Sequence, residues 1–167
     1  MKVDFFKDVS KRLINDRKFG ICDDNNKKPA YIKLTEEESW IATVVNNNRK
    51  EIIFTAIDNC IDIFNDSRVM DKRCDAMLTY DSSLMFVELK VKRDNWKSAG
   101  LQQIEAVVKR MIEEEKEFYY KFTRRKAIVA NPKYRFPCFE VSDKEKREIF
   151  NTKYKMRIQF ESEIEIR

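Results

Sequence analysis

The feature that most constrains the fold is a succession of strand, strand and helix patterns in the middle of the chain. Residues 73–80 and 84–92 are rich in apolar residues and flank the polar segment Asp81-Ser82-Ser83, which predicts a β-hairpin. A helix from about 98 to 120 should follow, because apolar residues then recur at helical spacing. These residues are Leu101, Ile104, Val108, Met111 and Ile112.

After this helix, residues 126–130 (KAIVA) predict a short buried strand. Because a helical crossover returns the chain in its original direction, this strand can pair parallel to the second strand of the hairpin. A hairpin with an added parallel strand makes a mixed sheet. We therefore predict an α/β fold, with a mixed β-sheet flanked by helices.

The segments on either side extend this pattern. Residues 4–18 predict an amphipathic helix with a stripe of Phe5, Val9 and Leu13. Thr35 followed by Glu38 fits a capping box, which predicts a second helix running through Val44. Residues 51–64 favour a strand or a pair of strands, and 156–160 favour one more. No repeat or linker divides the chain, so residues 1–167 are predicted to form one domain.

Composition excludes several classes of site. The chain has no histidine, which rules out Ser-His-Asp and Cys-His hydrolases and HExxH metalloproteases. Its 2 glycines and 3 prolines leave no glycine-rich phosphate loop. The 4 cysteines form no CxxC pair, so we expect them to be reduced and mostly buried, without zinc. Any catalysis must rest on carboxylates, Lys, Tyr, Cys or a metal.

Charge and hydropathy indicate surroundings and partners. The N-terminus lacks the apolar run of a signal peptide, and no stretch approaches the ~18 apolar residues of a membrane span, so we expect a cytoplasmic protein without a membrane partner. Residues 1–89 carry 14 basic and 16 acidic side chains, whereas residues 90–167 carry 20 and 13. The basic second half is compatible with a nucleic-acid partner, and equally with a solvated surface.

The strand that includes Glu88 and Lys90 has an unusual face. Both side chains leave the same face, since they are two residues apart, whereas the opposite face is apolar: Met85, Val87, Leu89 and Val91. Burial alone does not explain why Leu84 and Phe86 give way to Glu88 and Lys90 on that face. An ion pair at a strand end is the simpler interpretation, and a functional site is the other.

Asp75 can join this face only if the hairpin turn contains an even number of residues. A two- or four-residue turn would place Asp75 opposite Lys90 and Met77 opposite Glu88, because directly opposed residues of an antiparallel pair share a face. The two carboxylates, Asp75 and Glu88, would then offer hard oxygen ligands for Mg²⁺ or Mn²⁺. Lys90 beside them could orient water or stabilise developing charge.

Asp75, followed after twelve residues by Glu88-Leu89-Lys90, resembles the motif of the PD-(D/E)XK nuclease superfamily. Cys74 stands where the motif has proline. The resemblance covers about residues 50–130 and implies a restriction-endonuclease-like core. It also implies metal-dependent cleavage of phosphodiester bonds, with DNA as the expected substrate and Asp75 and Glu88 as metal ligands.

The resemblance implies two further site residues. A glutamine on the helix after the lysine strand maps to Gln103, which borders the apolar face of the predicted helix, in preference to Gln102. An acid from an earlier helix maps weakly to Glu38. Cutting both strands usually requires two sites, so a homodimer is compatible with this activity. The alternative function is an inactive nuclease-like fold that binds nucleic acid or, as immunity proteins do, another protein.

Overall fold

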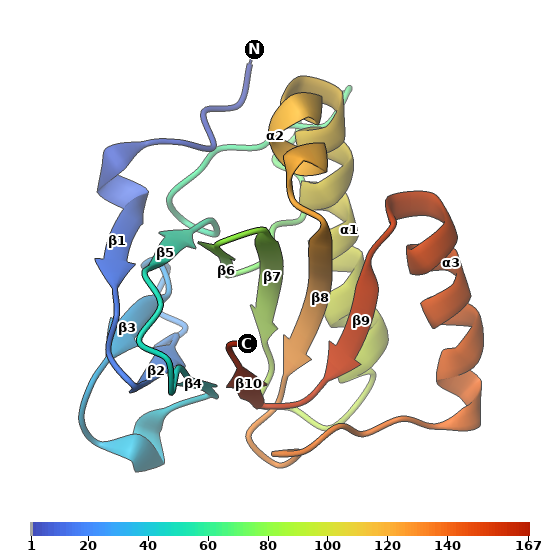
Figure 1. Cartoon of the computed structure of the whole chain (residues 1–167). Coiled ribbons are helices and arrows are strands. Elements are labelled where there is room, and N and C mark those ends of the chain that lie inside the picture. The colour runs from blue at the N-terminus through green and yellow to red at the C-terminus, as the bar shows by residue number, and fades with distance from the viewer. Residues whose placement is uncertain (1) are drawn as a thin grey trace.

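In this computed structural model, which describes residues 2–167, these residues fold into two β-sheets and three α-helices. The helices lie along one side of the larger sheet (Figure 1). The larger sheet has six strands, in the order β1 (Lys11–Ile14), β5 (Ile52–Ala56), β6 (Ala76–Tyr80), β7 (Ser83–Leu89), β8 (Arg124–Ala130) and β9 (Arg157–Phe160). The smaller sheet has the order β10 (Glu163–Glu165), β4 (Ala42–Val45), β2 (Lys18–Cys22) and β3 (Tyr31–Lys33).

The six-stranded sheet is mixed, as the sequence predicts. β6 and β7 form the antiparallel hairpin, and β8 pairs with β7 in the parallel direction after a helical crossover. β9 adds a second parallel pairing at the edge. Every residue of β7 is buried, since this strand lies inside the sheet and both its faces are covered.

Two hydrophobic cores lie on the two faces of this sheet. On one face, Leu84 and Phe86 of β7 pack with the apolar stripe of α1 (Trp96–Glu114). On the other face, Met85 and Val87 pack against the four-stranded sheet. Helices therefore cover one face of the mixed sheet, and a second sheet, which the sequence did not predict, covers the other.

The predicted helix after the hairpin begins slightly earlier than expected and is divided in two. α1 ends at Glu114, the helix is interrupted at Glu115, and the short α2 (Lys116–Lys121) follows. Trp96 begins α1, is buried, and stacks on Tyr134 with ring centroids 5.1 Å apart, which agrees with a packing role rather than an exposed stacking surface. Gly100 allows close contact with β8, because a Cβ there would lie 2.4 Å from Val129 Cγ1.

The prediction of a helix over residues 4–18 was wrong. This segment contains a short 3₁₀ helix (Asp8–Ser10) and then β1, which pairs antiparallel with β5. Val9 and Leu13, two members of the proposed stripe, are 84% and 63% exposed. Helical spacing was coincidental here, and pairing with β5 decided the conformation.

The prediction of a helix from Thr35 through Val44 was also wrong. Only Glu37–Ser39 form a 3₁₀ turn, without a side-chain cap, and the chain then enters β4. Trp40 turns inward instead, and its indole N–H donates to the carbonyl oxygen of Thr35 at 2.9 Å. A Cβ on Gly20 would lie 2.0 Å from Trp40 Cγ, so this residue of β2 must be glycine for the ring to pack there.

The remaining predictions were confirmed in part. Residues 51–64 contain β5 but continue as a loop, and β9 falls within 156–160. The helix α3 (Lys144–Tyr154), preceded by the 3₁₀ turn Val141–Asp143, was not predicted. The 4 cysteines are free, and 2 of them, Cys22 and Cys74, are buried. No helix within residues 2–167 has the length and apolar character needed to cross a membrane.

Candidate active site

The β6–β7 hairpin brings Asp75 and Glu88 together. Its turn consists of Asp81 and Ser82, and Tyr80 pairs with Ser83. The even-length turn that the sequence requires is therefore present. The register differs by two residues from the predicted one, because Tyr80 pairs with Ser83. If the pairing is continued by one residue beyond Ala76 and Val87, Asp75 lies opposite Glu88 and not Lys90.

Each of these two carboxylates bonds to the neighbouring strand. The backbone N–H of Asp75 donates to Glu88 Oε2 at 3.2 Å, and the N–H of Leu89 donates to Asp75 Oδ2 at 2.6 Å. Asp75 is 6% exposed and Glu88 is 2% exposed. Two acids thus lie side by side on the α1 face, at the end of an otherwise apolar strand pair.

Burial makes the charged forms of both acids costly. It raises the pKa of Asp75 to about 6, against the opposing hydrogen bond from Leu89. Burial, and then the charge of Asp75, raise the pKa of Glu88 to about 9, with Lys90 opposing the shift. A positive charge beside the two acids would stabilise their charged forms. The Lys90 ammonium does so only in part, since the pKa of Glu88 stays raised.

Lys90 lies beside the two acids and is held from two sides. Its Nζ is 2.7 Å from Glu88 Oε1 and also donates to Gln103 Oε1. The Nε2 of Gln103 in turn donates to the carbonyl oxygen of Arg73 at 3.0 Å. Because a carbonyl only accepts, this contact orients the amide so that its oxygen faces Lys90. The structure thus brings Asp75, Glu88, Lys90 and Gln103 together.

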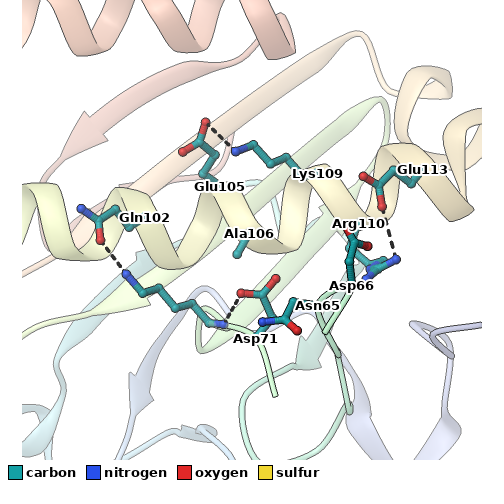
Figure 2. A pocket seen from close by; sticks show the side chains of 10 residues that line it. Asn65, Asp66, Asp71, Gln102, Glu105, Ala106, Lys109, Arg110 and Glu113 are labelled. Carbon is teal, nitrogen blue, oxygen red and sulfur yellow. Dashed lines mark hydrogen bonds and ion pairs between the residues drawn. The ribbon is translucent and has the colours of Figure 1, made fainter. Parts of the chain in front are cut away.

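The loop from β5 to β6 leads into Asp75 and is tied to α1. Arg73 pairs with Asp58 at 2.9 Å, and Lys72 Nζ donates to Gln102 Oε1 at 2.7 Å. Gln102 therefore faces the loop on the outer side of α1 (Figure 2), whereas Gln103 faces Lys90. Neither Asp58 nor Arg73 was predicted to contribute to the site, because their contacts join residues distant along the chain.

A cavity of about 450 Å³ lies between α1 and this loop (Figure 2). Its charged side chains largely pair with one another, as Lys109 does with Glu105 at 3.6 Å and Arg110 with Glu113 at 3.3 Å. The lining includes neither Asp75 nor Glu88. The cavity is therefore separate from the acidic pair.

A second cavity, of about 540 Å³, adjoins Lys90. It lies between the loop after β2, which contributes Asp23, and the segment that joins β7 to α1, which contributes Lys92, together with Trp96 at the start of α1. Its volume falls within the range of roughly 300–1,000 Å³ for ligand pockets. Burial is the main cause of the raised pKa of Asp75, and the hydrogen bond from Leu89 lowers it. The negative charge of Asp23 is the next contribution, and it raises this pKa further. Asp23 lies in the loop directly after β2, a strand of the second sheet, and was not predicted as a site residue.

The donor set at Asp75 and Glu88 fits a hard divalent cation. Mg²⁺ is commonly bound through one or two carboxylates, with water and substrate phosphate as its other ligands. Within residues 2–167, no group of three or more His, Cys, Asp or Glu side chains is arranged to hold a metal. Glu38, predicted as a further acid of the site, is exposed in the 3₁₀ turn before β4. It makes none of the contacts of Asp75 and Glu88 described above.

No family model, curated protein or solved structure matches this chain. The resemblance to the PD-(D/E)XK superfamily thus stays a prediction from a short motif. What can be inferred about function rests on the geometry of the two acids, the lysine and the glutamine.

Proposed function

We propose that this protein is a metal-dependent nuclease that hydrolyses phosphodiester bonds, with DNA as its expected substrate. In this proposal the hairpin, α1 and β8 form a restriction-endonuclease-like core. The observation that supports it most is the grouping of two buried carboxylates, a lysine and an amide at the end of one strand pair, Asp75, Glu88, Lys90 and Gln103. A purely structural ion pair has no need of a second buried acid.

Asp75 and Glu88 would hold Mg²⁺ or Mn²⁺. Such a cation, when bound, polarises the phosphoryl oxygen, lowers the pKa of a bound water and steadies the leaving oxygen. Lys90 can then orient the attacking water or stabilise charge that develops on the phosphate. Gln103 keeps the Lys90 ammonium in place through its own hydrogen bond to the Arg73 carbonyl. The adjoining cavity gives the substrate strand access to Lys90.

The test is cleavage of DNA and, in parallel, of RNA with Mg²⁺ or Mn²⁺. We expect cleavage that requires the cation and falls at least about a hundredfold in Asp75→Asn, Glu88→Gln and Lys90→Met variants. Asp81→Asn in the hairpin turn is the matched control, because it removes a carboxylate from the same hairpin, outside the site, and should cleave normally. Cleavage of DNA and RNA that survives loss of both site carboxylates would refute the proposal.

The alternative is a protein that keeps this arrangement without hydrolysis and binds nucleic acid or another protein. It is favoured by the internal pairing of the site, where Glu88 already contacts both Asp75 and Lys90. Melting curves separate the two functions, since a cation that binds the native state must raise the melting temperature. A melting temperature unchanged by millimolar Mg²⁺ and Mn²⁺, together with no cleavage, would establish the alternative.

A further inference from the structure

Three cationic side chains meet on one face of the six-stranded sheet, near the start of β8 and β9. Lys126 of β8 stands directly opposite Arg157 of β9 in the parallel register. Arg124 lies two residues before Lys126, so its side chain leaves the same face. We call Arg124, Lys126 and Arg157 the basic row. Their backbones lie within about 5 to 7 Å of their neighbours in the row.

The basic row lies on the opposite face of the sheet from the candidate active site. Further along β8, Ile128 and Ala130 share its face and pack against the four-stranded sheet, whereas Asp75 and Glu88 lie on the face that packs against α1. The apolar cover ends before Lys126, which is half-buried. Arg124 and Arg157 are exposed at this border.

Nearby carboxylates balance the charges of the basic row only in part. Within the described part of the chain, none of its three side chains forms an ion pair, and the ion pairs nearby belong to Arg167 with Glu165 and Arg135 with Glu163. Burial lowers the pKa of Lys126; Glu161 opposes this, and the charges of Arg167, Arg157 and Arg124 lower it further. Arg167 thus adds a fourth cation beside the row.

A half-buried lysine among arginines is an unfavourable arrangement unless an anion joins it, and Glu161 offsets the repulsion only in part. Arginine presents a planar fork of N–H donors that matches the oxygens of a phosphate, and it does so better than a lysine alone. The two exposed arginines lie next to this half-buried lysine, Arg124 along β8 and Arg157 across on β9, and can reach one phosphate or two successive ones.

We propose that the basic row binds the phosphate groups of a polyanion, supplied either by a nucleic-acid strand or by a free polyphosphate. This site is separate from Asp75 and Glu88 and does not depend on the nuclease activity proposed above. This site gives a function to part of the excess positive charge of residues 90–167. If the protein cuts nucleic acid, the row would extend the bound strand beyond the site of cleavage.

The experiment measures binding of a labelled single-stranded oligonucleotide by fluorescence anisotropy, with EDTA present so that no cleavage occurs. It compares the full chain with an Arg124→Gln/Arg157→Gln variant and with a Lys116→Gln/Lys144→Gln control. Both variants lose two exposed positive charges. Melting curves first establish that both are folded. Inorganic tripolyphosphate and polyglutamate serve as competitors.

We expect the basic-row variant to bind at least about tenfold more weakly. The slope of log affinity against log salt should fall by about 1.4, which is the release of two phosphate contacts on a single strand. The control should change little in either quantity. Competition by tripolyphosphate at low concentration would identify a free polyphosphate as a ligand, and weak competition would favour the nucleic-acid strand.

Two results would overturn this proposal. One is an equal loss of affinity in the two variants, which would mean that binding follows net charge and not this site. The other is competition by polyglutamate as strong as that by tripolyphosphate, because the row would then not distinguish phosphate from carboxylate. Because EDTA prevents cleavage, a failure of this proposal and a failure of the nuclease proposal give different results.

Discussion

Asp75 and Glu88 face each other across two antiparallel strands, and the N–H of Asp75 donates to the Glu88 carboxylate at 3.2 Å. Two acids with raised pKa values are thus held next to each other by the backbone of the hairpin. Moving the two carboxylates apart would cost the hydrogen bonds that they accept from the N–H groups of Asp75 and Leu89. This relationship makes the candidate site a source of instability at the pH where both acids are charged.

We expect the cation-free protein to lose stability as the pH rises. The folded pKa values of about 6 for Asp75 and about 9 for Glu88 lie above the ordinary values of 3.8 and 4.5, so the folded protein binds more protons than the unfolded chain. The stability that these groups contribute is therefore complete below the ordinary values and is lost as the pH rises through 6 and then 9. Melting curves between about pH 4 and 9 would measure this loss.

Glu88→Gln should accordingly stabilise the cation-free protein near pH 8, by about 2–4 °C for each kcal/mol gained. At pH 8 the Glu88 carboxyl, with a folded pKa of about 9, must take up a proton that it lacks in the unfolded chain, and glutamine removes this cost. The substitution keeps the side-chain shape and leaves a Lys90 whose 22% exposure lets water solvate it. The same variant should no longer gain stability from Mn²⁺, whereas the parent protein should. A variant that melts below the parent protein at pH 8 would show that the ion pair with Lys90 outweighs the cost of burial.

Gln103 and Gln102 form a matched pair for testing the position of Lys90. Gln103→Leu removes the contacts with Lys90 and the Arg73 carbonyl, so we expect kcat to fall by about 10- to 100-fold with KM little changed. Gln102→Leu, which loses only the exposed contact with Lys72, should keep the parent kcat. Steady-state cleavage kinetics would measure both, and equal effects of the two variants would contradict a positioning role.

Gly100→Ala should destabilise the protein although alanine favours helices. The gain from helix propensity is about 1 kcal/mol, but the added Cβ would lie 2.4 Å from the buried Val129 side chain. Overpacking of this kind typically costs about 1–3 kcal/mol, and Val129, β-branched and completely buried, cannot move aside easily. Denaturant unfolding would measure the net loss. A more stable Gly100→Ala variant would mean that α1 shifts away from β8 without cost.

Asp143→Asn should destabilise the contact between α1 and the segment before α3. Asp143 is buried, lies 2.7 Å from Lys97 Nζ and accepts the N–H of Glu140 at 2.9 Å. Losing a charged hydrogen bond of this kind costs about 1.5–3 kcal/mol. Glu140→Gln is the control, since that side chain is exposed and 3.8 Å from Lys97, and it should unfold like the parent protein. Chemical denaturation of both variants gives the comparison.

The central strand-helix-strand pattern could be predicted because local signals agree there. β6, β7, α1 and β8 each have a clear apolar period, and Asp81-Ser82 provides the turn between the first two strands. The grouping of Glu88 with Lys90 follows from strand alternation alone. The pairing of Asp75 with Glu88, rather than with Lys90, could not be predicted. The predicted and the observed registers differ by two residues, and both place Asp75, Glu88 and Lys90 on the same face.

The four-stranded sheet could not be predicted because long-range pairing decides it. β4 is a short segment that also fits a helical pattern. Its two partners, the antiparallel β2 and the parallel β10, are both distant from it along the chain. Asp23 could not be predicted as a site residue for the same reason. It lies near Asp75 only because this sheet packs on the larger one. Contacts of Arg73 with Asp58 are likewise a product of tertiary structure.

The parallel pairing of β10 with β4 has a consequence for the order of synthesis. β10 begins at Glu163, while its partner ends at Val45, so the small sheet can be completed only after the residues through Glu165 have left the ribosome. Until then, Val44 lacks its final neighbour Ile164. Contacts between residues so distant along the chain slow folding. The nascent protein should therefore pass through a stage in which this sheet has an open edge, which chaperones or other chains can bind.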